Sequence, residues 1–136
     1  MTKFAVALAM LVGLSQTTLA DDFPGRPRVL RAAEVLAEKI EIYDSSLHLV
    51  QAPNDYIEKV HHSEESVNEL VELLRTGTYG EAVEENRHVH NDMWLMYNQF
   101  ITIQPLLYNP TVVNNWNQMI YAHNALLAAW RHAEFH

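Results

Sequence analysis

Four segments of this 136-residue chain repeat apolar residues at alternating steps of three and four, and proline or glycine separates each segment from the next. This spacing is typical of amphipathic helices that bury one stripe along their whole length. The stripes run from Val29 to Val50, from Tyr56 to Leu74, from Ala82 to Ile103 and from Val112 to Trp130. Long helices with short connections predict an all-α fold, an antiparallel up-down-up-down four-helix bundle.

The breaks between these stripes carry signals for helix ends. Asn54 and Asp55 follow Pro53 and are candidate N-caps of the second helix. Two glycines in "RTGTYG" suit the end of that helix. Pro110 suits the first turn of the fourth helix. The sequence therefore places the helix boundaries within a few residues.

The first twenty residues have the form of a secretory signal. An apolar run from Phe4 to Leu14 is followed by a short polar stretch that ends in small residues at Ala20. A retained membrane anchor needs about 18 or more apolar residues, and this run is shorter. We therefore expect a signal peptide over residues 1–20, a flexible N-terminal arm over 21–28 and a bundle over 29–136. The mature protein is expected in the periplasm or outside the cell.

Composition excludes several classes of function. The chain has 17 acidic and 9 basic residues, a balance that disfavours nucleic acid and anionic lipid as partners. It has no cysteine, which rules out disulfides, thiolate metal sites and covalent haem attachment. Neither paired inward carboxylates nor a nucleophile with an orienting base is evident, so we expect no enzymatic activity. No segment after the signal is apolar enough to predict a membrane span.

The fourth stripe carries a histidine, His123, in the middle of an apparent core face. In an antiparallel bundle, residues equally far in sequence from the turn between two helices lie at the same level along the bundle axis. Counting from His123 back through each turn in this way brings other polar or sulfur-bearing side chains to its level. These residues are Tyr43, Ser63, Glu64, His90 and Met93, with Met96 about one turn away. The sequence thus predicts a polar layer across the middle of the bundle.

This layer allows a structural interpretation and a ligand-binding one. Tyr43, Ser63 and the histidines could satisfy one another by hydrogen bonds and fix the helix register. A buried histidine could also make the bundle sensitive to pH. In the ligand-binding interpretation, His123 and His90 are imidazole ligands and Met93 or Met96 is a thioether ligand. Imidazole suits zinc, copper or iron, whereas thioether selects copper(I) and also serves as an axial haem ligand.

Copper and haem are the favoured cofactors, and zinc also fits. The stretch "HNDMWLM" places His90, Met93 and Met96 at steps of three with Trp94 adjacent, a setting suited to a cuprous ion. Haem would need flat walls, which Tyr43, Tyr97, Trp116 and Trp130 could supply. Other histidines are expected to face water, in "HHSEES" (His61 and His62, with Glu65) and in the Glu85–His88 pair.

The signal peptide, the single short bundle and the histidine on the last helix resemble the periplasmic four-helix cytochromes of the b562 and c-prime type. The resemblance covers the mature chain in outline and implies haem held between helices, with His123, or else His132, as the last-helix ligand. The methionine early in the first helix of the b-type bundle is absent, and so is the Cys-x-x-Cys-His motif of the c type.

These observations predict an exported helical bundle that binds a transition-metal ion or haem through its His/Met layer. The alternative is a non-enzymatic envelope interaction or stress module. In that case the buried His/Tyr/Ser layer is structural or pH-sensing, and a protein partner or a second copy of the chain docks on the acidic outer faces.

Overall fold

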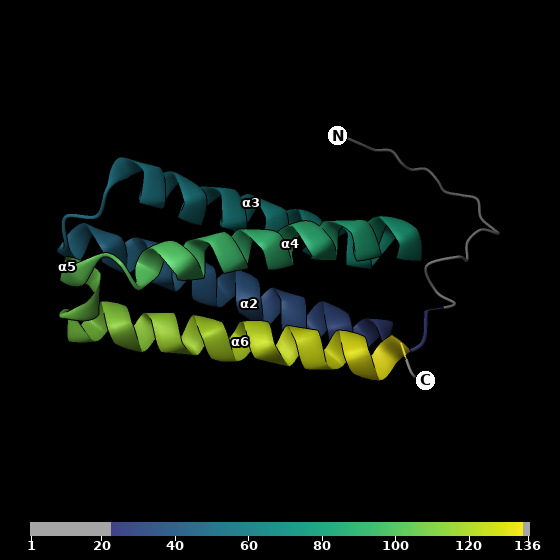
Figure 1. The fold of residues 1–136 in the computed structure, drawn as a ribbon. Helices are drawn as coiled ribbons and strands as arrows, with labels where there is room; N and C mark the ends of the chain where they lie inside the picture. The colour runs from purple at the N-terminus through teal and green to yellow at the C-terminus, as the bar shows by residue number, and fades with distance from the viewer. Residues whose placement is uncertain (1–22, 135–136) are drawn as a thin grey trace.

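The computed structural model describes residues 23–134, and every regular element in this range is a helix (Figure 1). The elements are α2 (Arg26–Ser46), the short 3-10 helix η1 (Leu47–Leu49), α3 (Asn54–Thr76), α4 (Tyr79–Phe100), α5 (Gln104–Leu107) and α6 (Pro110–Glu134). No strand occurs in this range, which confirms the all-α prediction. The predicted signal peptide, residues 1–20, lies outside the described residues and stays a prediction.

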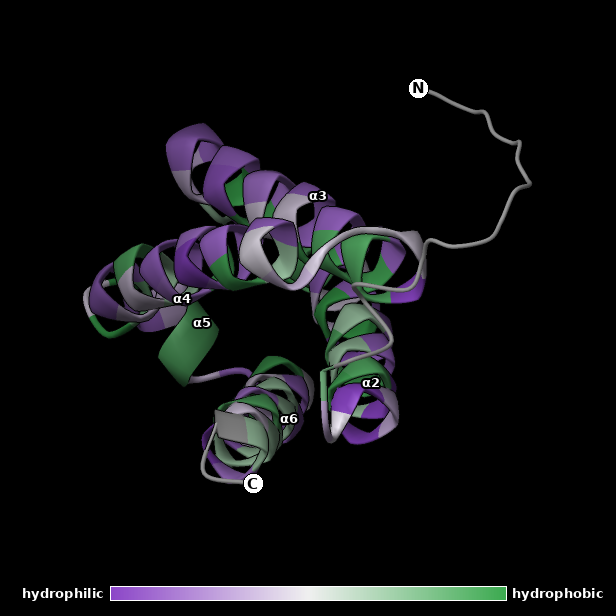
Figure 2. Cartoon of the chain, turned by 90° about the vertical axis from the view of Figure 1, so that its right-hand side faces the viewer, coloured by the Kyte–Doolittle hydropathy of each residue, from purple (hydrophilic) through white to green (hydrophobic). Residues whose placement is uncertain are grey.

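The four long helices lie lengthwise beside one another, and their contacts are uneven (Figure 1). Helix α2 packs closely against both α3 and α6, and α3 packs closely against α4. Helices α4 and α6 make little direct contact in the part of the chain that the structure describes. The end-on view shows the ribbons of α4 and α6 set apart from each other, and much of the hydrophobic colouring faces the interior (Figure 2). One of the four seams between neighbouring helices is therefore loosely packed.

The predicted stripes form the core. Within the long helices, the apolar stripe residues are buried almost completely. Full burial of a large aliphatic or aromatic side chain contributes about 1.5–3 kcal/mol, so these stripes account for much of the stability. No helix within residues 23–134 combines the length and apolar character needed to cross a bilayer.

The predicted N-terminal arm is partly integrated into the fold. Helix α2 starts at Arg26, earlier than Val29, because Pro27 suits a first helical turn. Phe23 is buried and stacks on Trp130, with ring centroids 5.2 Å apart. Gly25 has a φ of 80°, a left-handed conformation that glycine adopts without steric cost and that turns the chain into α2. Residues 26–28 of the predicted arm therefore belong to α2, and Phe23 belongs to the core.

Two helix starts differ from the prediction. Helix α3 begins at Asn54 with Pro53 in the N-cap position, and no side chain caps it, so neither Asn54 nor Asp55 has the predicted role. Helix α4 begins with a capping box that the stripe pattern does not reveal. The Glu81 amide donates to Thr78 Oγ1 at 3.2 Å, and the Thr78 amide donates to Glu81 Oε1 at 2.9 Å.

The link between α4 and α6 is also more ordered than predicted, because it contains the additional helix α5. Helix α6 begins at Pro110, as predicted. The Asn109 side chain accepts a hydrogen bond from the Val112 amide at 3.1 Å, which satisfies one free donor of the first turn. This ordered link fixes where α6 starts relative to α4.

The capping box makes Thr78 a measurable contributor to stability. Thr78→Ala removes the acceptor for the Glu81 amide and should lower the free energy of unfolding by about 1 kcal/mol. Urea denaturation followed by far-UV circular dichroism measures this change. Thr76→Ala is the matched control, because the exposed Thr76 hydroxyl only donates to the Glu72 carbonyl within its own helix. Equal losses for the two variants would contradict a capping role.

Candidate functional site

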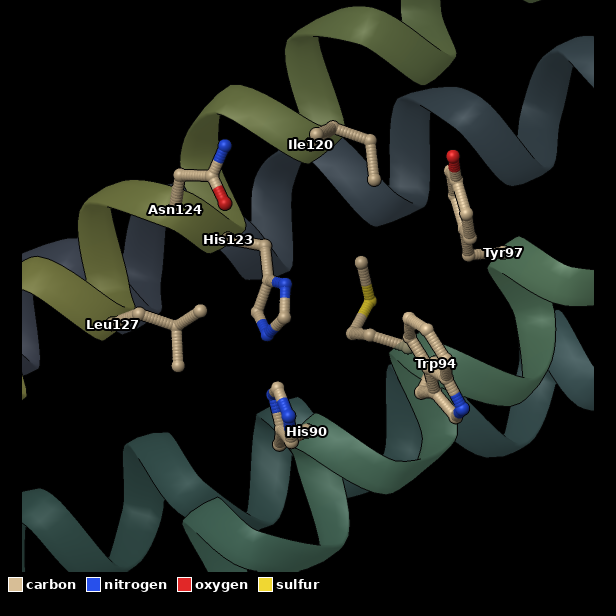
Figure 3. Close-up of a pocket in the computed structure, with 8 residues that line it drawn as sticks. His90, Trp94, Tyr97, Ile120, His123, Asn124 and Leu127 are labelled. Carbon is tan, nitrogen blue, oxygen red and sulfur yellow. The ribbon is translucent and has the colours of Figure 1, made fainter.

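The loosely packed seam between α4 and α6 contains a cavity of about 320 Å³ that opens to the surface (Figure 3). The residues that line it are His90, Met93, Trp94 and Tyr97 from α4, and Ile120, His123, Asn124 and Leu127 from α6. Most of these side chains are apolar or aromatic, and none is a carboxylate. The cavity therefore combines apolar walls with two imidazoles, as small-ligand sites commonly do.

His123 is the most unusual residue of this cavity. Its side chain is only 8% exposed, and its Nε2 atom is buried with no hydrogen-bond partner among the described residues. His90 reaches the same space from α4, and the two ring centroids are 5.6 Å apart with an interplanar angle of 31°. Figure 3 shows the two imidazoles pointing toward each other across the seam. The structure thus brings together the two histidines that the sequence selected.

Burial keeps the His123 ring uncharged at neutral pH. Loss of solvent, together with the neighbouring charge of His90, lowers its pKa to about 4. A neutral imidazole has a ring nitrogen with a free lone pair, which is the form that binds metals. An unsatisfied buried polar group costs about 1–3 kcal/mol, so this arrangement is maintained at the expense of stability.

Of the two predicted methionine ligands, the structure brings only one to the cavity. Met93 is 2% exposed and lines the cavity together with the two histidines. Met96 is fully buried and is not among the lining residues. The three-residue step between them turns the helix by about 300°, so Met96 is displaced around the helix axis from Met93. Met96 is therefore a core residue, and its assignment as a ligand is not supported by its position.

An aromatic wall runs from the mouth of the cavity into the core. Trp94 is 58% exposed and stacks on Tyr97 with ring centroids 6.1 Å apart. Tyr97 stacks on Trp116 at 6.0 Å, and Trp116 stacks on Phe100 at 4.0 Å. Of the four predicted wall residues, Tyr97 lines the cavity and Trp116 lies directly behind it.

The other two predicted wall residues pack elsewhere. Tyr43 contacts the inner side of Trp116, with ring centroids 5.4 Å apart. Trp130 packs against Phe23 and Tyr79. The aromatic wall of the cavity is therefore shorter than the sequence suggests.

The predicted polar layer does not form one hydrogen-bonded network. The Tyr43 hydroxyl pairs with the Tyr56 hydroxyl, and burial raises the pKa of both phenols. The Ser63 hydroxyl is fully buried and has no partner within residues 23–134. The mutual satisfaction of Tyr43, Ser63 and His123 expected in the structural interpretation is therefore absent from these residues.

Glu64 belongs to a separate cluster on the seam between α2 and α3. It lies beside Asp44 of α2 and His61 of α3, and one ligand atom from each residue falls within 4.8 Å of the others. Burial raises the pKa of Glu64 to about 8, together with a hydrogen bond to Asp44 and the charges of Asp44, Glu41 and Glu65. Helical periodicity did not reveal this cluster, because Asp44 and His61 both lie outside the apolar stripes.

The histidines expected to face water are exposed, but two of them have partners that the sequence did not predict. His61 Nε2 lies 3.3 Å from Asp44 Oδ2, and His62 Nδ1 lies 2.9 Å from Asp92 Oδ2. Each contact joins α3 to a neighbouring helix, where the sequence suggested pairing with Glu65 within α3. His88 is exposed and lies 3.4 Å from Glu85, as predicted.

The depressed pKa of His123 predicts acid destabilisation of the metal-free protein. Between about pH 6.5 and pH 4, this residue takes up a proton in the unfolded chain but not in the folded one. The free energy of unfolding should therefore fall with pH across this window and level off below it, by up to about 3 kcal/mol for this group. Urea denaturation at pH 7.5 and pH 4.5 measures the loss.

His123→Leu should lack this part of the acid loss, whereas His88→Ala, which changes an exposed histidine, should keep it. Identical acid losses in the wild type and His123→Leu would show that other groups cause the destabilisation.

Comparisons with known proteins do not extend this description. No protein-family model, curated protein or solved structure matches the chain. The assignment of a function therefore rests on the residues of the chain itself.

Proposed function

We propose that the protein is an exported, non-enzymatic antiparallel four-helix bundle that binds a transition-metal ion between α4 and α6. His123 is the first ligand, His90 the second and Met93 the third. The observation that carries this proposal is the buried His123 Nε2, which has no partner within the described residues and lines the same cavity as His90 and Met93.

The separation of the two imidazoles suits a shared ion. Metal–nitrogen bonds are about 2.0–2.1 Å long, so two imidazoles bound to one ion have ring centroids at most about 6.5 Å apart. The observed separation between His90 and His123 is 5.6 Å, within this limit. His90 is exposed and free to adjust its rotamer, whereas His123 is held by the surrounding core. One ligand is thus fixed and the other can move to the ion.

The chemistry of the lining favours copper(I) over harder ions. Two imidazoles and a thioether form a soft donor set, and thioether selects copper(I). No carboxylate lines the cavity, which disfavours magnesium, calcium and manganese. The Trp94 indole at the cavity wall offers an aromatic face on which a cation is also stabilised. A cuprous ion is therefore the occupant that these residues match best.

Haem is the second candidate, favoured by the aromatic wall and the loose seam. Tyr97 and Trp94 give the cavity a flat side, and two histidines are available as axial ligands. A porphyrin is much wider than an ion, so α4 and α6 would have to move apart to admit it. This seam is the one at which the long helices have least contact to lose.

Anaerobic titration with copper(I) in competition with a chromophoric chelator tests the proposal. His123→Leu should bind copper(I) at least tenfold more weakly than the wild type, because it removes the fixed ligand. His88→Ala should bind as the wild type does, because His88 lies on the same helix but outside the cavity. Met93→Leu should weaken copper(I) more than zinc, since the thioether contributes mainly to soft-ion affinity.

Equal copper(I) affinity in the wild type and His123→Leu would contradict the copper proposal. Titration with haemin separates the second candidate. A sharp Soret band in the wild type that His123→Leu lacks, with no tight copper(I) binding, would identify haem as the occupant.

A further inference from the structure

We infer a second cation site, independent of the α4/α6 cavity, on the seam between α2 and α3. Asp44, His61 and Glu64 converge there and would hold a divalent transition-metal ion, for which zinc is the best match. The site uses a different pair of helices and none of the residues assigned to copper binding.

The positions of the three side chains follow from helix geometry. His61 and Glu64 are three residues apart on α3, so both project from the same side of that helix. Asp44 approaches from α2, with its Oδ2 atom 3.3 Å from His61 Nε2. One ligand atom from each of the three residues falls within 4.8 Å of the other two.

Only small side-chain movements are needed to bind an ion. Zinc holds its nitrogen and oxygen ligands at about 2.0–2.2 Å, so ligand atoms in a tetrahedral site lie about 3.3–3.6 Å apart. The pair formed by Asp44 and His61 already has this spacing. The His61 side chain is 57% exposed, so its ring can adjust without disturbing the core. The helices that carry the three residues are held in place, because α2 and α3 pack closely against each other.

The surroundings of the site favour a cation. Glu41 and Glu65 act on Glu64 with the same sign of charge as Asp44. Glu64 also lines an open groove of about 620 Å³, together with Glu34, Glu38, Glu41 and Glu72. The lining of this groove includes one cation, Arg75, which pairs with Glu34 at 2.9 Å. Such a concentration of negative charge raises the local concentration of cations.

The donor set indicates which cation. One imidazole and two carboxylates match zinc, which commonly takes three protein ligands and a water molecule. The ion would replace the proton that Glu64 and Asp44 share in their hydrogen bond, and that proton would be released to solvent. Calcium requires six to eight oxygen ligands, and magnesium retains most of its water. The presence of His61 therefore favours a transition-metal ion over either alkaline-earth ion.

Isothermal titration with zinc at pH 7 tests the inference, using a His90→Ala/His123→Leu background that disables the α4/α6 cavity. This background should bind one equivalent of zinc. Adding Glu64→Gln or His61→Ala should weaken that binding at least tenfold. Adding His62→Ala should leave it unchanged, because His62 is the adjacent exposed histidine and pairs with Asp92 instead. Far-UV circular dichroism verifies that each variant keeps its helical content.

Three outcomes would overturn the inference. The first is an absence of zinc binding in the background. The second is binding that Glu64→Gln and His61→Ala leave intact, which would place the ion on other histidines. The third is displacement of zinc by equimolar calcium, which would show that the carboxylates attract cations without selecting zinc. Because the background lacks both histidines of the copper site, failure here leaves the copper proposal unaffected, and failure of the copper proposal leaves this site unaffected.

Discussion

The packing of α2 against two neighbours leaves one seam of the described chain open. Helix α2 contacts both α3 and α6 along its length, and α3 contacts α4, so three seams are closed by interdigitating apolar side chains. The seam between α4 and α6 is the one left loosely packed in the described chain, and the 320 Å³ cavity lies there. Because His123 belongs to the face of α6 that borders this seam, its imidazole is buried and yet reachable through the cavity.

Some buried polar groups have a partner among the described residues, whereas others, such as the Ser63 hydroxyl of α3, have none. At the closed α2/α3 seam, the Tyr43 and Tyr56 hydroxyls satisfy each other. At the open seam, His123 Nε2 has no partner in the range 23–134. A fold under selection for stability alone would place an apolar residue at position 123, since an unsatisfied buried group costs about 1–3 kcal/mol. A bound ligand that completes the coordination of His123 would explain why this cost is tolerated.

Sequence periodicity predicts the four stripes and the start of α6 at Pro110, because burial of one helix face leaves a direct record in residue spacing. It misses the Phe23–Trp130 contact and helix α5, which depend on tertiary packing and loop geometry. Counting residues from each turn predicts that His90, Met93 and His123 lie together, as they do in the structure. The same count groups Met96, Tyr43 and Glu64 with these residues, and in the structure they lie elsewhere. Residues at one level of the bundle can face different seams.

The central claim is that His123 is maintained for binding and not for folding. The most direct test is the free energy of unfolding of His123→Leu relative to the wild type, measured with urea at pH 7.5 in the presence of a metal chelator. The account predicts a variant as stable as the wild type or more stable by about 1 kcal/mol, because leucine fills the site without an unsatisfied nitrogen. A loss of about 2 kcal/mol or more would contradict it, since a loss of that size indicates a structural interaction of the imidazole.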